Sequence, residues 1–160
     1  MLDALAEAWK EELEMTVLLV GPVRDSRLRR RLDSMSGDKR VVWLRELPRA
    51  EMYALIQKSA ATVLPSLADN FPNTVLESLA LGVPVIGGRG ASVDELVEDG
   101  KTGELVELGD VKGLAQSMIR AWRGELAAKK GFVWESGVRK LMEPSQAVRA
   151  LGEVAGIELV

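Results

Sequence analysis

Two acidic residues lie eight positions apart in one short stretch of the chain, between Pro65 and Glu77. Asp69 belongs to a segment rich in turn-forming residues, and Glu77 belongs to a segment of helical period. A carboxylate accepts two hydrogen bonds and suits vicinal hydroxyl groups, as on a ribose or a hexose ring. An Asp before a helix can also be a simple cap, and a helix Glu can simply be exposed. The stretch is therefore a candidate sugar-binding site.

The helix expected over residues 72–81 supplies a second kind of chemistry. It follows a short strand, and ligands of open parallel sheets bind at the carboxyl ends of strands. The free amides of Asn73 and Thr74, with the positive end of the helix dipole, could bind phosphate oxygens, whereas Pro72 has no N–H to donate. Glu77 lies one turn further on the same face. The buried stripe of this helix is expected to consist of Val75, Leu76, Leu79 and Ala80.

The elements that position these residues follow from the pattern of apolar residues. Short runs rich in Val, Ile and Leu alternate with longer segments of helical period, which is typical of a parallel sheet covered by helices. Asp110 is expected to cap a helix, and Met52, Leu55 and Ile56 to form the apolar stripe of another. The sequence predicts one Rossmann-like α/β domain over residues 1–160. Its expected strands are 15–20, 41–44, 62–64, 84–86 and a weak edge strand at 104–106, and its expected helices are 2–13, 26–34, one starting near Pro48, 72–81, 93–98, 111–122, 132–142 and 144–155.

Three glycines follow the strand expected at 84–86. Gly87, Gly88 and Gly90 would allow a ligand or a neighbouring element to approach the backbone closely, or they would form a looser turn.

Composition excludes several functional classes. The 160 residues contain no Cys and no His, which excludes a disulfide scaffold, a thiolate zinc site and a cysteine nucleophile, and leaves acid/base chemistry to carboxylates. The net charge of −3 argues against a nucleic-acid binder. With no apolar run long enough for a membrane span and no signal-peptide pattern, we expect a soluble, cytoplasmic protein.

One segment, from Arg24 to Arg40, is locally basic. It is either a solvated helix face or a surface for phosphate or for peripheral contact with an anionic membrane. Its further cations are Arg27, Arg29, Arg30, Arg31 and Lys39.

The run PSLADNFPNTVLESLALGVPVIGG resembles the signature of the donor domain of a large family of retaining glycosyltransferases with the GT-B fold. In that family an acidic residue, seven intervening residues and a Glu are followed by an Ala-x-Gly-x-Pro-Val turn. Asp69 takes the place of the family's usual first Glu, and Glu77 matches the second acid. The segments VVWLRELPRAEMYALIQKSAATVLPS, DELVEDGKTGELVELGD and FVWE extend the resemblance in the same order, to about residues 2–142.

The resemblance implies roles for individual residues. Glu77 would bind the ribose hydroxyls of a UDP- or GDP-hexose, Asp69 would contact the donor sugar, and the amides of Phe71, Asn73 and Thr74 would hold the sugar and the pyrophosphate. Because Asp69 is shorter than Glu, the donor sugar stays open. No metal is expected in the chemistry, and no cofactor besides the nucleotide-sugar substrate. The main chain near Arg45 and Glu46 would contact the base of the nucleotide. The remaining donor-binding positions would be Ser66, Asn70 and Gly21.

The resemblance also implies that one strand and one domain are missing. The family's donor domain opens with a strand that ends in Gly-Arg, near a Lys, and a separate domain binds the acceptor. The strands at 15–20 and 62–64 would then pair directly or face a gap. A partner chain, a segment exchanged within a homodimer, or Gly156–Val160 would fill that gap, and the chain alone would bind UDP or GDP without transferring sugar.

Two other functions stay open. The chain could be a non-catalytic module that binds nucleotide-sugars or pairs with a partner transferase. It could also be a sugar epimerase of similar architecture, whereas a dehydrogenase is disfavoured because no Gly-x-Gly-x-x-Gly follows an early strand.

Overall fold

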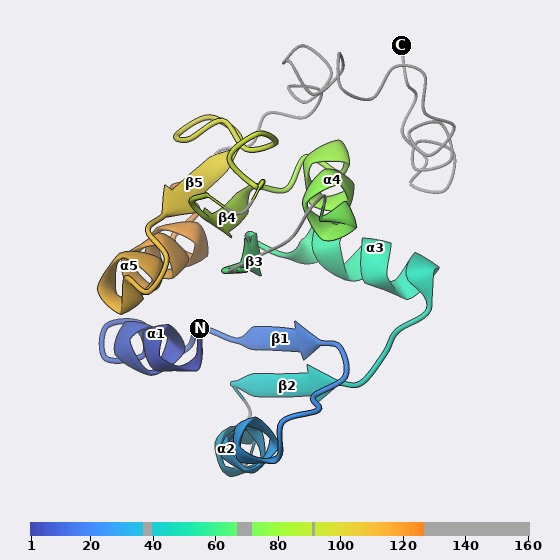
Figure 1. Cartoon of the computed structure of the whole chain (residues 1–160), viewed down its shortest axis with the longest axis vertical. Coiled ribbons are helices and arrows are strands. Elements are labelled where there is room, and N and C mark those ends of the chain that lie inside the picture. Colours follow the sequence, from blue (N-terminus) through green and yellow to red (C-terminus); the bar gives the residue numbers. More distant parts are fainter. Residues whose placement is uncertain (37–39, 67–71, 91, 127–160) are drawn as a thin grey trace.

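The computed structural model describes residues 1–36, 40–66, 72–90 and 92–126 of the chain. Among these residues helices and strands alternate along the sequence, as expected for an α/β fold (Figure 1). The helices are α1 (Leu2–Ala8), α2 (Ser26–Ser36), α3 (Arg49–Lys58), α4 (Asn73–Ala80) and α5 (Val111–Trp122). The strands are β1 (Val17–Val20), β2 (Val41–Leu44), β3 (Thr62–Leu64), β4 (Val85–Gly88) and β5 (Gly103–Val106).

The strands form two parallel sheets rather than one. In the first sheet β1 pairs with β2, with Val17 opposite Val41. In the second sheet the order is β3-β4-β5, with Thr62 opposite Val85 and Val85 opposite Gly103. Figure 1 shows β1 and β2 side by side and separated from β3. Of the two alternatives expected for the strands at 15–20 and 62–64, direct pairing is not found, because β1 and β3 belong to different sheets.

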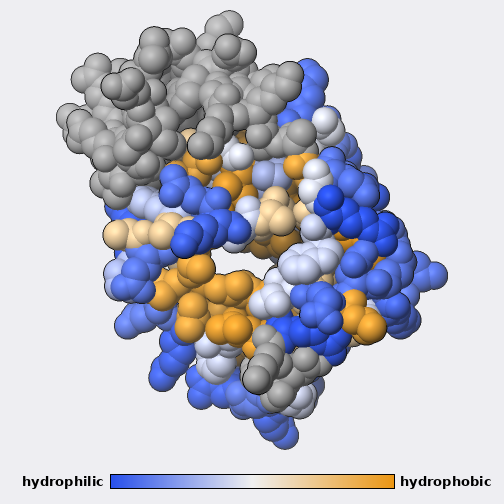
Figure 2. Space-filling view, turned by 180° about the vertical axis from the view of Figure 1, so that it is seen from behind, coloured by the Kyte–Doolittle hydropathy of each residue, from blue (hydrophilic) through white to orange (hydrophobic). Residues whose placement is uncertain are grey.

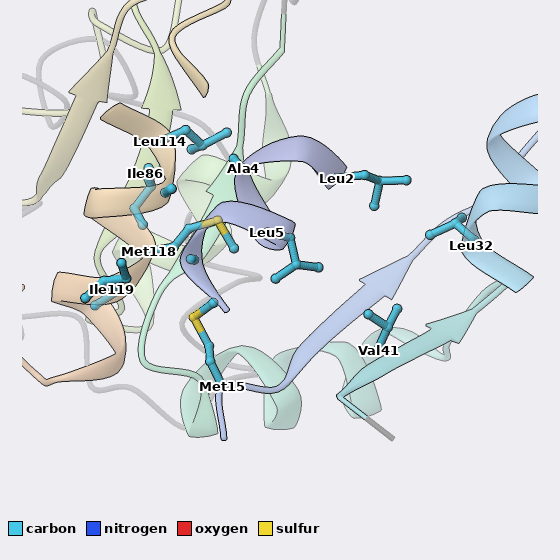
Figure 3. Packing of buried hydrophobic residues seen from close by; sticks show 13 residues of the cluster. Leu2, Ala4, Leu5, Met15, Leu32, Val41, Ile86, Leu114, Met118 and Ile119 are labelled. Atoms are coloured by element: carbon cyan, nitrogen blue, oxygen red, sulfur yellow. The ribbon is translucent and has the colours of Figure 1, made fainter. Parts of the chain in front are cut away.

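The largest hydrophobic core joins the two sheets on one face. Helices α1 and α5 pack against each other there (Figure 3), bringing Leu5 close to Met118 and Ile119 and placing Met15 beneath them. Leu5 and Ile119 are at most 1% exposed. The two halves of the molecule are therefore held together by helices, although their strands are not hydrogen-bonded to one another.

A second core packs α4 onto the sheet β3-β4-β5. Val75 and Leu79 of α4 and Val85 of β4 are all at most 2% exposed. This agrees with the apolar stripe expected for α4, in which Ala80 is only half-buried.

Close packing accounts for the glycines of β4 and β5. A Cβ on Gly103 would lie 1.9 Å from the carbonyl oxygen of Val85, and one on Gly87 would lie 2.3 Å from a methyl carbon of Val93. Gly90 instead has φ +84° and open space around it, as a turn residue would. Each of the two interpretations of this glycine cluster therefore holds at one position. A neighbouring element approaches the backbone closely at Gly87, and a turn forms at Gly90.

The structure confirms most expected elements and corrects three. Residues 93–98 form turns rather than a helix, and Ser92 before them has φ +57°, outside the helical region. The helix expected over 2–13 ends at Ala8 and is followed by turns, in which Leu13 is 66% exposed. In α3 the buried residues are Tyr53 and Ile56, whereas Met52 and Leu55 are half-buried. The helices expected at 132–142 and 144–155 and the strand Gly156–Val160 lie outside the described residues.

Helix α2 presents its arginines to solvent. Arg31 forms an ion pair with Asp3, and the guanidinium of Arg29 lies 5.5 Å from the ring centre of Trp43. Contact of this helix with a membrane surface stays a prediction. Within the described residues, no helix combines the length and the hydropathy that crossing a bilayer requires.

Candidate functional site

The amino end of α4 carries two exposed residues and no side-chain cap. Pro72 is the N-cap residue, and its carbonyl accepts a hydrogen bond from the amide of Val75 at 3.0 Å. No described side chain accepts a bond from the first amides, and Asn73 and Thr74 are exposed. Amides at this position lie at the positive end of the helix dipole and can bind an anion. The two residues are thus exposed at this helix end, and binding of phosphate by their amides stays a prediction.

A buried hydroxyl fixes α4 to the neighbouring strand. Ser78 is fully buried, and its hydroxyl lies 2.7 Å from the hydroxyl of Thr62 on β3 and 2.7 Å from the carbonyl of Thr74. Each polar group of this small network has a partner, so burial costs little. Because Thr62 begins β3 and Ser78 lies in the second half of α4, the bond ties the later part of the helix to the start of the strand.

Glu77 has a partner that sequence reasoning missed. The hydroxyl of Tyr53, from α3, donates a hydrogen bond of 3.3 Å to Oε1 of half-buried Glu77. Burial, and then the negative charge of Glu77, raises the pKa of Tyr53, so the phenol stays a neutral donor near neutral pH. Tyr53 is the only Tyr of the chain. The sequence contains one signal for this contact. Tyr53 lies one turn before the apolar Ile56, on the face of α3 that contacts α4.

Gly21 lies at the carboxyl end of β1 and is tied to β2. Its amide donates to the carbonyl of Leu44 at 2.9 Å, and its carbonyl accepts a bond of 2.9 Å from the indole N–H of Trp43. Gly21 has φ +139°, which a side chain would strain. Arg45 and Glu46 follow β2 directly, with exposed side chains. These three predicted site residues therefore lie together at one sheet end.

Ser66 lies beyond the carboxyl end of β3, close to the end of β4. A Cβ on Gly88 would be 2.9 Å from the carbonyl oxygen of Ser66. Gly88 therefore allows the segment after β3 to pass close to β4, and Ser66 itself is half-buried.

The predicted site residues form two groups on different sheets. Ser66, Asn73, Thr74 and Glu77 follow β3, whereas Gly21 and the pair after β2 belong to the other sheet. Three more predicted residues lie outside the described part of the chain, so the structure does not test their roles. They are Asp69, Asn70 and Phe71. In the described ranges no three acidic residues come together as metal ligands would, and a metal-free site stays a prediction.

Fold and site together define an α/β domain of parallel sheets, in which a helix with an exposed amino end and a half-buried carboxylate follows a strand. The family of glycosyl transferases group 1 matches residues 1–123, which is most of the chain. The chain belongs to this family. The resemblance inferred from the sequence motifs is confirmed.

Curated relatives match over part of the chain. A D-inositol 3-phosphate glycosyltransferase of Thermobifida fusca is 31% identical over 105 residues, which cover 59% of this chain and 24% of that protein. An N-acetyl-alpha-D-glucosaminyl L-malate synthase of Bacillus anthracis is 37% identical over 71 residues, covering 44% of this chain and 19% of the relative. The chain thus spans about a quarter or less of the length of these relatives.

Solved structures confirm the fold. A sucrose-phosphate synthase from Thermosynechococcus elongatus has a TM-score of 0.73 at 22% identity, covering 95% of this chain and 40% of the synthase chain. A pneumococcal O-GlcNAc transferase in complex with UDP and GlcNAc has a TM-score of 0.69 at 20% identity, covering 96% of this chain and 32% of the transferase. At these identities the likeness concerns the GT-B fold, and it confirms the Rossmann-like fold class predicted above.

Proposed function

We propose that this chain binds the nucleoside diphosphate part of a sugar donor, a UDP- or GDP-hexose, at the amino end of α4. The amides of Asn73 and Thr74 bind diphosphate oxygens, and the carboxylate of Glu77 accepts hydrogen bonds from the ribose hydroxyls. Asp69 contacts the donor sugar, while the main chain after β2, at Arg45 and Glu46, borders the base.

The observation that carries this proposal is the surroundings of Glu77. Its carboxylate is half-buried one turn beyond two exposed amides, and the buried phenol of Tyr53 holds one of its oxygens. The second oxygen can accept from a ligand. A helix amino end beside an oriented carboxylate fits a group that carries both negative charge and vicinal hydroxyls, as a nucleoside diphosphate does. The pneumococcal transferase of the same fold, solved with UDP and GlcNAc, supports this chemistry.

In this proposal the whole protein is a retaining glycosyltransferase, and this chain contributes its donor side. Glycosyl transfer places the acceptor against the donor sugar, and the leaving diphosphate is stabilised by fixed dipoles and charges. None of the residues assigned above binds an acceptor. We therefore expect no transfer by the isolated chain to any acceptor, although it binds nucleotide.

Isothermal calorimetry with UDP, GDP and ADP tests the binding step. We expect saturable binding of UDP or GDP and a loss of about tenfold to a hundredfold in affinity for Glu77→Gln, since hydrogen bonds to a charged group contribute about 1.5 to 3 kcal/mol. Glu14→Gln is the matched control, because Glu14 is exposed before β1 and distant in sequence from α4. Equal affinity of Glu77→Gln and the parent chain would show that the ribose role is wrong.

A transfer assay separates the enzyme from the non-catalytic module. The chain is mixed with an acceptor-binding domain of a group 1 glycosyltransferase, a labelled UDP- or GDP-hexose and an acceptor of that enzyme. Product formed with both parts and abolished by Glu77→Gln supports the donor role. Nucleotide binding without product in every combination supports the module.

A further inference from the structure

Strand β5 forms one border of its sheet. Among the described residues it pairs with β4 only, and Figure 1 shows it on the side of the sheet opposite β3. A border strand presents outward N–H and C=O groups, on which a strand of another molecule can pair. The partners of these groups in β5 therefore decide whether this border of the sheet can associate.

The hydrogen bonds between β4 and β5 show which backbone groups point outward. The amide of Arg89, just after β4, donates to the carbonyl of Val106 at 2.9 Å. Alternate residues of a parallel strand bond to opposite sides, so the backbone groups of Gly103 and Leu105 point away from β4. These are the groups that a further strand would have to reach.

Neighbouring residues already occupy these outward groups. The amide of Leu105 donates to Oδ1 of Asp99 at 2.9 Å, and the carbonyl of Leu105 accepts from Nη2 of Arg89 at 3.3 Å. The carbonyl of Gly103 accepts a bond of 2.8 Å from the amide of Gly100. The turn before β5 and one side chain after β4 thus cover the outward side of the strand.

Asp99 and Arg89 also hold each other in this place. Nη2 of Arg89 lies 2.8 Å from Oδ2 of Asp99, and its Nε lies 3.1 Å from Oε1 of Glu107, which follows β5. The guanidinium is therefore held by acids from both ends of the strand. The bond from the Leu105 amide lowers the pKa of Asp99, with burial opposing it and Arg89 adding to it, so the carboxylate is charged near neutral pH.

Charged side chains, rather than apolar ones, lie over the outward side of β5. The side chains of Asp99 and Arg89 are 47% and 43% exposed, so they belong to the surface of the molecule. Figure 2 shows mainly hydrophilic side chains on the side formed by β5 and α5, whereas hydrophobic ones gather near the middle of the molecule. A second strand would have to displace two charged, hydrogen-bonded side chains before it could pair with β5.

We infer that Asp99 and Arg89 close the border of β5 against pairing with the β5 strand of a second copy of the chain. Two identical strands related by a twofold axis run antiparallel, and two residues directly opposite each other then exchange both backbone bonds. The N–H and C=O groups of Leu105 are the pair that two copies would exchange. They are also the pair that Asp99 and Arg89 occupy.

This inference is independent of the proposed function. Asp99 and Arg89 belong to the connection between β4 and β5, whereas the predicted donor-binding residues follow β1, β2 and β3. A failure of nucleotide binding would leave the closed border unaffected, and the reverse holds as well.

Light scattering on the purified chain tests the inference. Asp99→Ala frees the amide of Leu105, and we expect its average mass to rise from 17.4 kDa toward twice that value as the concentration increases from about 10 μM to about 1 mM, where weak pairs form. Asp99→Asn keeps an oxygen that can accept from Leu105. We expect its mass, like that of the parent chain, to stay constant.

Asp110→Ala is the matched control. Asp110 is exposed and accepts a bond of 2.9 Å from the amide of Gly113 at the start of α5, so this variant also frees a backbone amide but opens no strand. We expect a lower thermal midpoint without a rise in mass. A rise equal to that of Asp99→Ala would overturn the inference, because loss of stability would then explain both.

Amide hydrogen exchange in NMR spectra identifies the surface that associates. At the low end of the concentration range we expect the Leu105 amide of Asp99→Ala to exchange about fivefold faster than in the parent chain, and at the high end to slow again as copies pair. Arg89→Ala frees only the carbonyl of Leu105, so we expect it to associate more weakly than Asp99→Ala. Constant mass in both variants, or a dimer that leaves the Leu105 amide in fast exchange, would contradict the inference.

Discussion

Strands β4 and β1 show that neighbours, rather than composition, decide burial in this molecule. Strand β1 reads VLLV and is wholly aliphatic, whereas β4 reads VIGG. All four residues of β4 are buried, because strands flank it on both sides. The more apolar β1 has one strand neighbour among the described residues, and its Leu18 is 42% exposed. An aliphatic strand this exposed indicates a surface that needs a partner.

The largest contrast between these strands concerns stability. We expect Ile86→Ala in β4 to cost about 4 kcal/mol of unfolding free energy, because the side chain is fully buried and its removal leaves a cavity. The corresponding truncation in β1, Leu18→Ala, is expected to cost less than about 0.5 kcal/mol of unfolding free energy, since the Leu18 side chain is already partly hydrated. Urea denaturation of both variants measures the difference. Similar losses in the two variants would contradict the contrast between the strands.

A smaller effect concerns an ion pair that ties β5 to α5. Arg120 Nε lies 2.8 Å from Oε1 of Glu104, whose side chain is 18% exposed, and this hydrogen bond holds the pKa of Glu104 below its ordinary value. A lowered folded-state pKa stabilises the fold above the unfolded-state pKa, and this stabilisation disappears as the pH falls below 4.5. We expect Glu104→Gln to cost about 1 kcal/mol at pH 7 and less at pH 3.

Urea denaturation at both pH values checks this prediction, with Asp3→Asn as the comparison in the other half of the molecule. Asp3 pairs with Arg31 but is exposed, so we expect a smaller effect at pH 7. A loss for Glu104→Gln that is independent of pH would show that packing, rather than charge, is responsible.

The smallest effect concerns the residue that positions Glu77. Tyr53→Phe keeps the buried ring but removes the hydroxyl that donates to Glu77, and one such hydrogen bond contributes about 0.5 to 1 kcal/mol. On the proposed function, UDP or GDP affinity falls about threefold, while the thermal midpoint stays nearly constant. A double-mutant cycle with Glu77→Ala gives the readout, because alanine removes the oxygen that accepts from Tyr53 and the effect of Tyr53→Phe should then vanish. An effect that persists there would make Tyr53 a structural residue only.

Local sequence signals predicted the regular elements well. Helix α5 covers Val111–Trp122 as expected, and its cap Asp110 accepts a hydrogen bond of 2.9 Å from the amide of Gly113. Caps and apolar period are local properties, so the sequence alone contains them. The turns at residues 93–98 were predicted wrongly as a helix, because the left-handed backbone of Ser92 redirects the chain, and a Ser gives no warning of that conformation.

Contacts between distant residues were harder to predict. The helical period marked α3 as amphipathic, but the contact between Tyr53 and Glu77 depends on how two helices pack, which no local pattern determines. The gap between the sheets was predictable only through the resemblance to a family with an additional strand. Of the candidate site, the helix that carries Glu77 forms where it was expected, whereas the roles of Glu77, Asp69, Asn70 and Phe71 stay predictions.

The central claim, that the amino end of α4 and Glu77 bind a nucleoside diphosphate, is tested most directly by NMR. The amide signals of Asn73 and Thr74 are followed while UDP or GDP is added to the ¹⁵N-labelled chain. We predict saturable shifts of both amides and of Glu77, with the signals of α5 unchanged. Nucleotide that binds while these amides keep their positions, with shifts confined to another part of the chain, would contradict the account.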